Sequence, residues 1–296
     1  MTLSPSVQGA LLGLCSFGLY AFSDVTIKFM GQGISPVQII FTASLFSLPF
    51  ILVQAVTSAG GLALRPVFPR WTLIRVVLTL VNSVIVSYTF TKLPIAQAYA
   101  IFFCMPLLIT LLAVPFLGER LDLPRVLAIV VGFSGVLIAL RPGSEPLQFA
   151  HLTAIVGATL GACNSLILRK ISETERASVM LLYPALAQTI VLGCLLPWLW
   201  VPMDLFTWSL GAMIAVLSVI GGVLIIAAYA RAPAIVVAPM QYSQIIWGAL
   251  CGVLIFGEAM DALMIFGIAV IIGAGLFLLW KSGQPAPVTP PVLQKS

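Results

Sequence analysis

Two stretches of the chain share one pattern: PIAQAYAIFFCMPLLITLLAVPFLGERLD (94–122) and PAIVVAPMQYSQIIWGALCGVLIFGEAMD (233–261). Each begins with proline, continues as a long apolar run and ends with G-E-x-x-D. A shift of 139 residues overlays four pairs of residues: Pro94 on Pro233, Gly118 on Gly257, Glu119 on Glu258, and Asp122 on Asp261. At about 1.5 Å per helical residue, each run can cross a hydrocarbon core of about 30 Å. The pair predicts an internal repeat of membrane-spanning helices.

The composition extends this prediction to the whole chain. Of its residues, 61% are hydrophobic and only 8% are charged, whereas soluble domains average about 25% charged residues. Apolar runs of spanning length recur along the sequence and leave almost no room for a soluble domain. We predict ten transmembrane helices, over residues 8–29, 35–56, 72–90, 95–117, 123–141, 150–170, 177–199, 205–230, 234–256 and 260–280.

The repeat divides these helices into two halves. Five helices per half is an odd number, so the second half must enter the membrane from the opposite side. The predicted fold is an all-α membrane protein of two inverted five-helix repeats, 1–145 and 146–281, with a disordered cytoplasmic tail over 282–296. The first helices of the halves align in two ways, with Lys28 on Arg169 or with Gly9 on Gly157, and the sequence leaves both open. Inverted repeats are a recurrent construction of secondary transporters.

The distribution of Lys and Arg predicts the orientation. With the N-terminus in the cytoplasm, eleven basic residues fall inside and three outside, namely Lys28, Lys92 and Arg141. Cytoplasmic loops carry the excess of basic residues in membrane proteins. We therefore expect both termini in the cytoplasm, in a bacterial inner membrane. The excess positive charge of +5 contains no basic run that would bind nucleic acid.

Three segments resemble the EamA family of the drug/metabolite transporter superfamily. The stretch from Leu93 to Leu121, with Pro106 and a terminal G-E, is similar to the family's fourth helix. The stretch from Ala238 to Glu258 is similar to the ninth, and S-D-V-T-I-K from Ser23 to Lys28 to the end of the first. Gln244 and Ile245 stand where many members carry a proline, which implies a subgroup. The resemblance implies a ten-helix carrier of small metabolites, such as amino acids, nucleosides, vitamins or S-adenosylmethionine, often an exporter.

Ionisable residues inside a membrane are costly, which makes them the first candidates for function. Asp24 and Lys28 are spaced i, i+4 near the end of the first helix, in the order that favours a helical ion pair. One interpretation is a local pair, with Lys28 reaching the headgroups. The other is a functional one, in which Asp24 acts as a gate, as a partner for a substrate amine or as a proton acceptor.

Polar and aromatic residues supply the other candidates for a substrate site. Gln241, Tyr242, Ser243 and Gln244 are four consecutive polar residues in the ninth helix, and they cannot all avoid lipid on one protein face. The repeat places Phe102, Phe103, Cys104 and Met105 opposite them. Further candidates are Tyr20, Asn82, Tyr99, Asn164 and Trp247. An amide and aromatic lining suits a zwitterionic or heteroaromatic solute, although helix-to-helix hydrogen bonds explain part of this set equally well.

The remaining polar residues are interpreted as structural. Glu119 and Glu258 are predicted to serve turns and helix caps, and His151, the single histidine, an interfacial anchor. The five cysteines lack the spacing of a metal site or redox motif, so we expect no metal and no cofactor.

The predicted function is secondary transport of a small organic metabolite, by a protein taken as a monomer with the solute and membrane lipid as its partners. A channel, a structural membrane partner and, least favoured, an intramembrane enzyme are the alternatives. An enzyme needs a paired nucleophile and base or a metal cluster. The sequence offers neither.

Overall fold

The computed structural model describes residues 4–57, 65–117, 123–140, 148–171, 175, 177–232 and 234–282, and all regular structure within these ranges is helical. This confirms the predicted all-α fold class. Some of the predictions fall outside the described residues: those on Gly118, Glu119, Asp122 and Pro233, on the boundary at 145/146, and on residues 283–296 of the tail.

Each predicted range is occupied by helix, in one piece or several. The first five ranges hold α1 (Pro5–Met30), α2 (Pro36–Thr57), α3 (Pro69–Lys92), α4 (Ile95–Phe102) with α5 (Met105–Leu117), and α6 (Leu123–Leu140). The last five hold α7 (Phe149–Ile171), α8 (Ala177–Ala187) with the π-helix η1 (Gln188–Leu192) and α9 (Gly193–Leu199), α10 (Leu205–Arg231), α11 (Ala234–Val237) with the 3₁₀ helix η2 (Ala238–Tyr242) and α12 (Ser243–Phe256), and α13 (Ala262–Ser282).

Seven helical stretches of the described chain are long and apolar enough to cross a membrane. Three further apolar helices are shorter: Val126–Leu140, Met240–Phe256 and Ala262–Leu278. Their positions agree with the fifth, ninth and tenth predicted ranges. By length and composition, the structure therefore supplies seven spanning helices where the sequence predicted ten.

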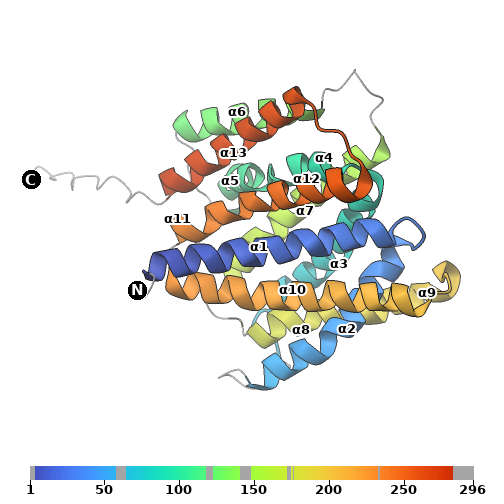
Figure 1. Cartoon of the computed structure of the whole chain (residues 1–296). Helices are drawn as coiled ribbons and strands as arrows, with labels where there is room; N and C mark the ends of the chain where they lie inside the picture. Colours follow the sequence, from blue (N-terminus) through green and yellow to red (C-terminus); the bar gives the residue numbers. More distant parts are fainter. Residues whose placement is uncertain are drawn as a thin grey trace, which may run out of the picture.

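The helices pack as a bundle in which partners come from opposite halves of the chain. α1 lies along α10, α3 along α7, and α6 along α13 (Figure 1). Gly135 and Gly267 let α6 and α13 approach closely, since a Cβ at Gly135 would lie 2.9 Å from the Gly267 carbonyl oxygen. α1 begins and α13 ends at the same end of the bundle (Figure 1). We call the opposite end, where α1 finishes at Met30, the outer end, after the predicted orientation.

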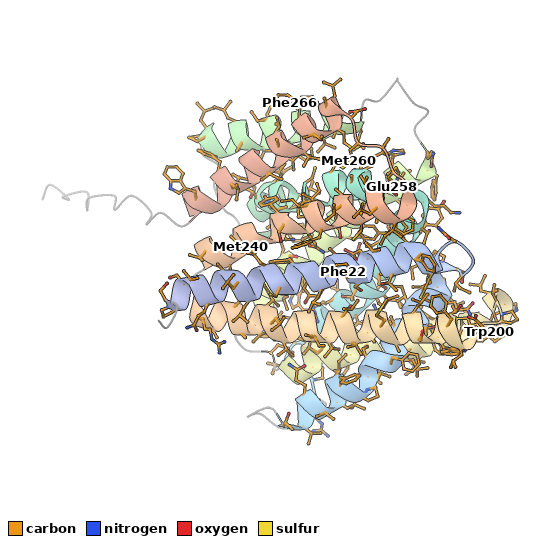
Figure 2. All side chains as sticks on the ribbon, viewed as in Figure 1. Phe22, Trp200, Met240, Glu258, Met260 and Phe266 are labelled. Carbon is orange, nitrogen blue, oxygen red and sulfur yellow. The ribbon has the colours of Figure 1, made fainter. Side chains whose placement is uncertain are left out.

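The outside of the bundle is apolar. Large hydrophobic side chains are exposed on most helices, among them Trp198 (79%), Val53 (64%) and Phe266 (56%), which points away from α13 (Figure 2). Monomeric soluble proteins rarely expose apolar patches of such extent. The surface is therefore suited to contact lipid chains.

Three of the helical segments consist of more than one piece, and in two of them, the fourth and the ninth, the interruptions touch each other. α4 ends at Phe102 and α5 begins at Met105, immediately before Pro106, which has no backbone N–H to continue the ladder. The second interruption is η2, before α12. The Phe103 and Tyr242 rings lie 5.2 Å apart between their centroids, and the shift of 139 residues relates these two positions.

Two buried side chains hold the connections next to α10 and α3. Gln38, at the start of α2, exchanges two hydrogen bonds with the Val201 backbone, at 2.7 and 3.0 Å. Glu175 accepts hydrogen bonds from the backbone N–H groups of Val67 and Phe68, at 2.9 and 3.1 Å. Gln38 and Glu175 come from opposite halves of the chain, and each forms hydrogen bonds with backbone groups of the other half. Backbone groups that precede a helix obtain partners away from water.

Candidate functional site

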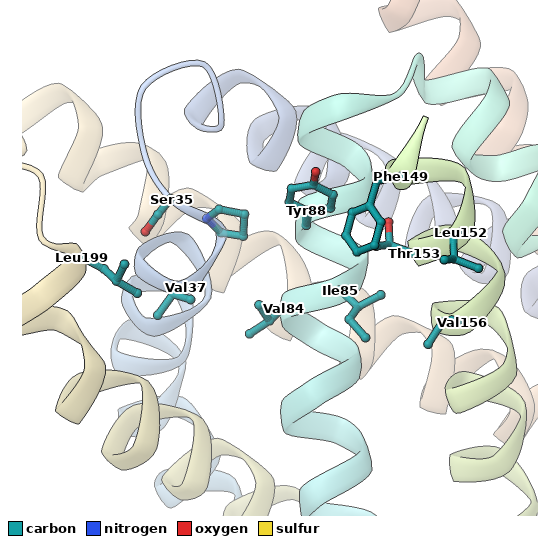
Figure 3. Close-up of a pocket in the computed structure, with 11 residues that line it drawn as sticks. Ser35, Val37, Val84, Ile85, Tyr88, Phe149, Leu152, Thr153, Val156 and Leu199 are labelled. Carbon is teal, nitrogen blue, oxygen red and sulfur yellow. The ribbon is translucent and has the colours of Figure 1, made fainter. Parts of the chain in front are cut away.

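An apolar groove of about 510 Å³ lies on the side of the bundle. The groove lies between the outer ends of α2, α3 and α7 and the end of α9 (Figure 3). Phe149 and Leu152 on its rim are 68% and 55% exposed. None of the described residues that line it is charged. It has none of the convergent polar groups that orient a ligand, so we place the functional site elsewhere.

A smaller cavity of about 160 Å³ contains the polar candidates. Its walls come from α1, α3, α4, α5, α7, η2 and α12, and thus from both halves of the chain. The residues that line it are Asp24, Asn82, Val86, Phe90, Tyr99, Phe102, Phe103, Met105, Gly157, Ala158, Gly161, Gln241 and Gln244. Seven of the eleven residues predicted to bind substrate belong to this set.

Asp24 is the centre of the cavity's hydrogen bonding. The Tyr99 hydroxyl on α4 donates to Asp24 Oδ2 at 2.7 Å, and the Gln244 amide on α12 donates to the same oxygen at 3.3 Å. One carboxylate therefore joins α1 to the fourth and ninth helical segments. Gly248 makes this possible, because any side chain there would collide with the Tyr99 ring.

Aromatic rings form one side of the cavity. Phe90 lies 5.4 Å from Tyr99 and 5.4 Å from Phe102, and Tyr99 lies 5.7 Å from Phe103, between ring centroids. These separations and tilts are those of favourable aromatic pairs. The side chains of Tyr99 and Phe103 are 3% and 4% exposed, so the rings are held by packing.

Small residues of α7 form the opposite wall. A Cβ at Gly157 would lie 3.3 Å from the Phe102 ring, and a Cβ at Gly161 would lie 2.9 Å from the Met105 sulfur. Gly157 and Gly161 have the spacing G-x-x-x-G, which permits close contact between helices. In the structure they also border the cavity, and their lack of side chains lets Phe102 and Met105 pack against α7.

At the outer end, Lys28 and Glu258 form what we call the outer cluster, together with Leu93 and Ile95. Lys28 Nζ lies 2.7 Å from Glu258 Oε1 and donates to the Leu93 carbonyl oxygen at 2.5 Å. Glu258 Oε2 accepts from the Ile95 backbone N–H at 2.9 Å. Lys28 is 13% and Glu258 11% exposed. The cluster connects α1, α4 and the end of α12.

The outer cluster corrects the predicted pairing of Asp24 with Lys28. Lys28 extends to Glu258 at the outer end, whereas Asp24 accepts its hydrogen bonds within the cavity. Glu258 reaches this place because Gly257 adopts a left-handed conformation, with φ of 64°, and turns the chain back at the end of α12. Glu258 was predicted to serve a turn or cap. It does cap the first turn of α4, and it also carries the ion pair.

Four predicted site residues lie away from the cavity. Tyr20 packs against Gly221 of α10, and Asn164 accepts a hydrogen bond from Thr79 at 3.4 Å. Tyr242 is buried beneath α13, where its hydroxyl has no hydrogen-bond partner among the described residues. Trp247 lies over Gly18 of α1, facing a shallow groove on the surface. The spacing of these residues on their helices turns them toward neighbours and lipid.

Six residues of the cavity wall are not among the eleven that were predicted to bind substrate: Val86, Phe90, Met105, Gly157, Ala158 and Gly161. All are apolar or lack a side chain, so a search for polar groups in apolar helices passes over them. His151 accepts a hydrogen bond from the Gln148 N–H at 3.1 Å, beside the first turn of α7. No group of metal-ligating residues occurs within the described ranges.

Comparison with known proteins identifies the family. The EamA-like transporter family model matches residues 7–141. A riboflavin transporter of Rhizobium johnstonii is 31% identical over 80% of this chain and 77% of its own length. The chain belongs to the EamA-like transporter family. Members of this family are transporters of small-molecule solutes, and this protein is one of them and not an enzyme.

Other relatives match the chain from end to end. An S-adenosylmethionine uptake transporter of Rickettsia bellii is 26% identical over 95% of both chains. A pseudopaline exporter of Pseudomonas aeruginosa is 25% identical over 94% of this chain and 98% of its own. A crystal structure with 16% identity superposes with a TM-score of 0.63 over 93% of this chain and 99% of that one, which shows a shared fold.

Proposed function

We propose that this EamA protein is a secondary transporter that moves a small organic metabolite by alternating access across a bacterial inner membrane. In this proposal ten helices form two inverted repeats, both termini lie in the cytoplasm, and the 160 Å³ cavity holds the solute. The three shorter helices complete the ten. The contacts of α1 with α10 and of α3 with α7 support the repeat, because α1 and α7 are the first helices of the two halves and α3 and α10 are the third, so the repeat relates one contact to the other.

The observation that carries the proposal is the position of Asp24. A carboxylate inside an apolar bundle marks a solute or ion pathway by default. Here it lies in a cavity built from both halves and is held by Tyr99 and Gln244, one from each repeat. A site between two repeats is exposed to either side of the membrane when the repeats rock against each other.

The outer cluster supports a role as the outer gate. It joins α1 and the end of α12 to the start of α4, above the cavity, by an ion pair and two hydrogen bonds to backbone. We propose that opening toward the outside separates Lys28 from Glu258. In the present conformation the cluster closes that end.

The substrate is proposed at the level of its class, a small organic metabolite such as an amino acid, a nucleoside, a vitamin or an S-adenosylmethionine-like solute. The relatives are named for three different compounds, and for both uptake and export. Their names support transport and leave the direction open.

Flux through the purified protein tests the proposal. Proteoliposomes are given labelled amino acids, nucleosides, vitamins and organic cations without ATP, and we expect saturable uptake of at least one of them. Ala158→Leu fills the cavity wall and should lower this uptake at least about tenfold, a loss of about 1.4 kcal/mol in transition-state stabilisation. The measurement is the initial rate against solute concentration.

Ala269→Leu is the matched control, since Ala269 is exposed on α13 and lies outside the cavity. It should transport like the parent protein. Flux that rises linearly without saturation would indicate a channel, and equal flux in both variants would remove the solute from this cavity. Folded protein without any flux contradicts the proposed function.

A further inference from the structure

The cavity carries one charge and no opposite charge to balance it. Among the described residues that line it, Asp24 is the only acidic or basic one. The nearest cation along α1 is Lys28, and it is engaged with Glu258 in the outer cluster. Buried charges in proteins are normally paired, because an unpaired ion far from water costs several kcal/mol. The Asp24 carboxylate lacks such a partner within the described structure.

Neutral donors support this carboxylate on one side only. The Tyr99 hydroxyl and the Gln244 amide both donate to Oδ2, and among the described residues no hydrogen bond reaches Oδ1. The second oxygen is thus left for a group that is not part of the chain. A positively charged donor would give the shortest and strongest hydrogen bond to it.

A second acceptor lines the same cavity. The side-chain oxygen of Asn82 on α3 is buried and has no hydrogen-bond partner within the described residues. An unsatisfied buried acceptor costs about 1 to 3 kcal/mol, so it indicates a missing donor. Two acceptors from two helices, α1 and α3, therefore lack donors. An ammonium group has three N–H donors and no acceptor.

The aromatic wall suits the same chemistry. Phe90, Tyr99, Phe102 and Phe103 form one side of the cavity, and a cation near the face of an aromatic ring is attracted by the quadrupole of the ring. A carboxylate on the ligand finds no Lys, Arg or His in the lining. Anions, which would also meet the charge of Asp24, are therefore disfavoured.

From these observations we infer that the cavity binds a small organic cation, with its ammonium group against Asp24 and its apolar part against the aromatic wall. The inference rests on the proposed function for the movement of this ligand, but binding can be measured without transport. The size of the cavity agrees with a small ligand, since sites for drug-sized molecules have volumes of about 300 to 1,000 Å³.

The test is the binding of three probes that share one ring and differ in charge: benzylammonium, benzyl alcohol and benzoate. The full chain is purified in detergent, and the unfolding temperature is measured against the concentration of each probe. We expect benzylammonium to bind at least about tenfold more tightly than the other two, because a hydrogen bond to a charged group is worth about 1.5 to 3 kcal/mol.

Two variants assign the preference to Asp24. Asp24→Asn should weaken benzylammonium binding about ten- to hundredfold while leaving benzyl alcohol unchanged. Asp204→Asn is the matched control. Asp204 is an exposed carboxylate that caps α10, where hydrogen bonds from the Thr207 hydroxyl and N–H hold its pKa below the usual value. This control should bind like the parent protein.

The outcomes separate the inference from the proposed function. Equal or tighter binding of the neutral or anionic probe, absence of benzylammonium binding, or full retention of it in Asp24→Asn each overturns the inference. Saturable flux of a neutral or anionic solute alongside such a result leaves the proposed function intact. Charge-selective binding in a protein that transports nothing supports the cation site and contradicts the transporter mechanism.

Discussion

Asp24 and Glu258 are both carboxylates in an apolar bundle, but their surroundings differ. Glu258 is bound to a lysine and to a backbone N–H, with each of its oxygens engaged. Asp24 has neutral donors, and they share one oxygen. Lys28 lies one helical turn beyond Asp24 on α1, but it forms its ion pair with Glu258, which is much farther away in the sequence. In the outer cluster the carboxylate of Glu258 faces an opposite charge, whereas among the described residues the carboxylate of Asp24 has only neutral donors.

Breaking the complete pair should give the largest change in stability. Lys28→Met leaves Glu258 buried without its cation, and the loss of one partner of a buried pair costs about 3 to 5 kcal/mol. Glu258 is 11% exposed, so water relieves little of this cost. We expect a lower free energy of unfolding in a denaturing-detergent titration.

The double variant Lys28→Met, Glu258→Gln is the control for that prediction. Replacing both charged partners removes the unpaired ion, so much of the stability should return. A double variant as unstable as Lys28→Met would show that packing of the lysine chain, and not its charge, holds the outer end.

Removal of the Tyr99 hydroxyl, one of the two hydrogen-bond donors to Asp24, should change ligand affinity more than it changes the stability of the fold. Tyr99→Phe keeps the ring contacts with Phe90 and Phe103 and deletes the hydroxyl that donates at 2.7 Å. We expect a stability change of about 1 kcal/mol, within the range for single hydrogen bonds, and a several-fold change in ligand affinity. The measurements are the same unfolding titration and the probe-binding assay.

The parallel deletion Tyr88→Phe is the control, because Tyr88 borders the apolar groove and not the cavity. Its effect on probe binding should be absent. If Tyr99→Phe also left binding unchanged, Asp24 would be oriented by Gln244 and backbone packing alone.

The smallest effect is expected from an added methyl group beside the outer cluster. A Cβ at Gly252 would lie 2.5 Å from Glu258 Oε2, so Gly252→Ala must displace the carboxylate from Lys28 or from Ile95. Displacement weakens the pair without removing it, and we expect a loss of about 1 kcal/mol. Gly273→Ala on α13 is the matched control, since nothing lies within 4 Å of its added Cβ. Equal stability of the two variants would contradict the described geometry.

Much of the fold can be predicted from the sequence, because each spanning helix corresponds to a continuous apolar run. The positions of all ten segments and the break after Phe102, near Pro106, depend on local composition. The partner of Lys28 does not. Asp24 is one turn away and Glu258 is 230 residues distant, so local spacing favours the wrong carboxylate. Only the turn at Gly257 and the packing of α12 on α1 decide the pairing.

The polar residues of the site could be predicted from the sequence, but the small residues that border the cavity could not. Asp24, Asn82, Gln241 and Gln244 stand out because polar groups are costly in lipid. Gly157 and Gly161 have no side chains to mark them, and helix packing and a cavity wall use the same small residues. Tyr20 and Trp247 are as polar as Tyr99, but the rotation of their helices directs them elsewhere, and that rotation depends on contacts between distant segments.

The groove shown in Figure 3 affects how strongly the electrostatic field of a charge in the cavity is screened. Ile85 and Val156 line the groove, and their chain neighbours Val86 and Gly157 line the cavity, so the wall between the two is a single layer of helices. Under the proposed topology the groove is filled by hydrocarbon. The field of Asp24 then spreads through a medium of low dielectric constant on that side, and mobile salt cannot enter to screen it. Attraction between the carboxylate and a cation within the cavity would thus change little with ionic strength, unlike attraction at an exposed surface.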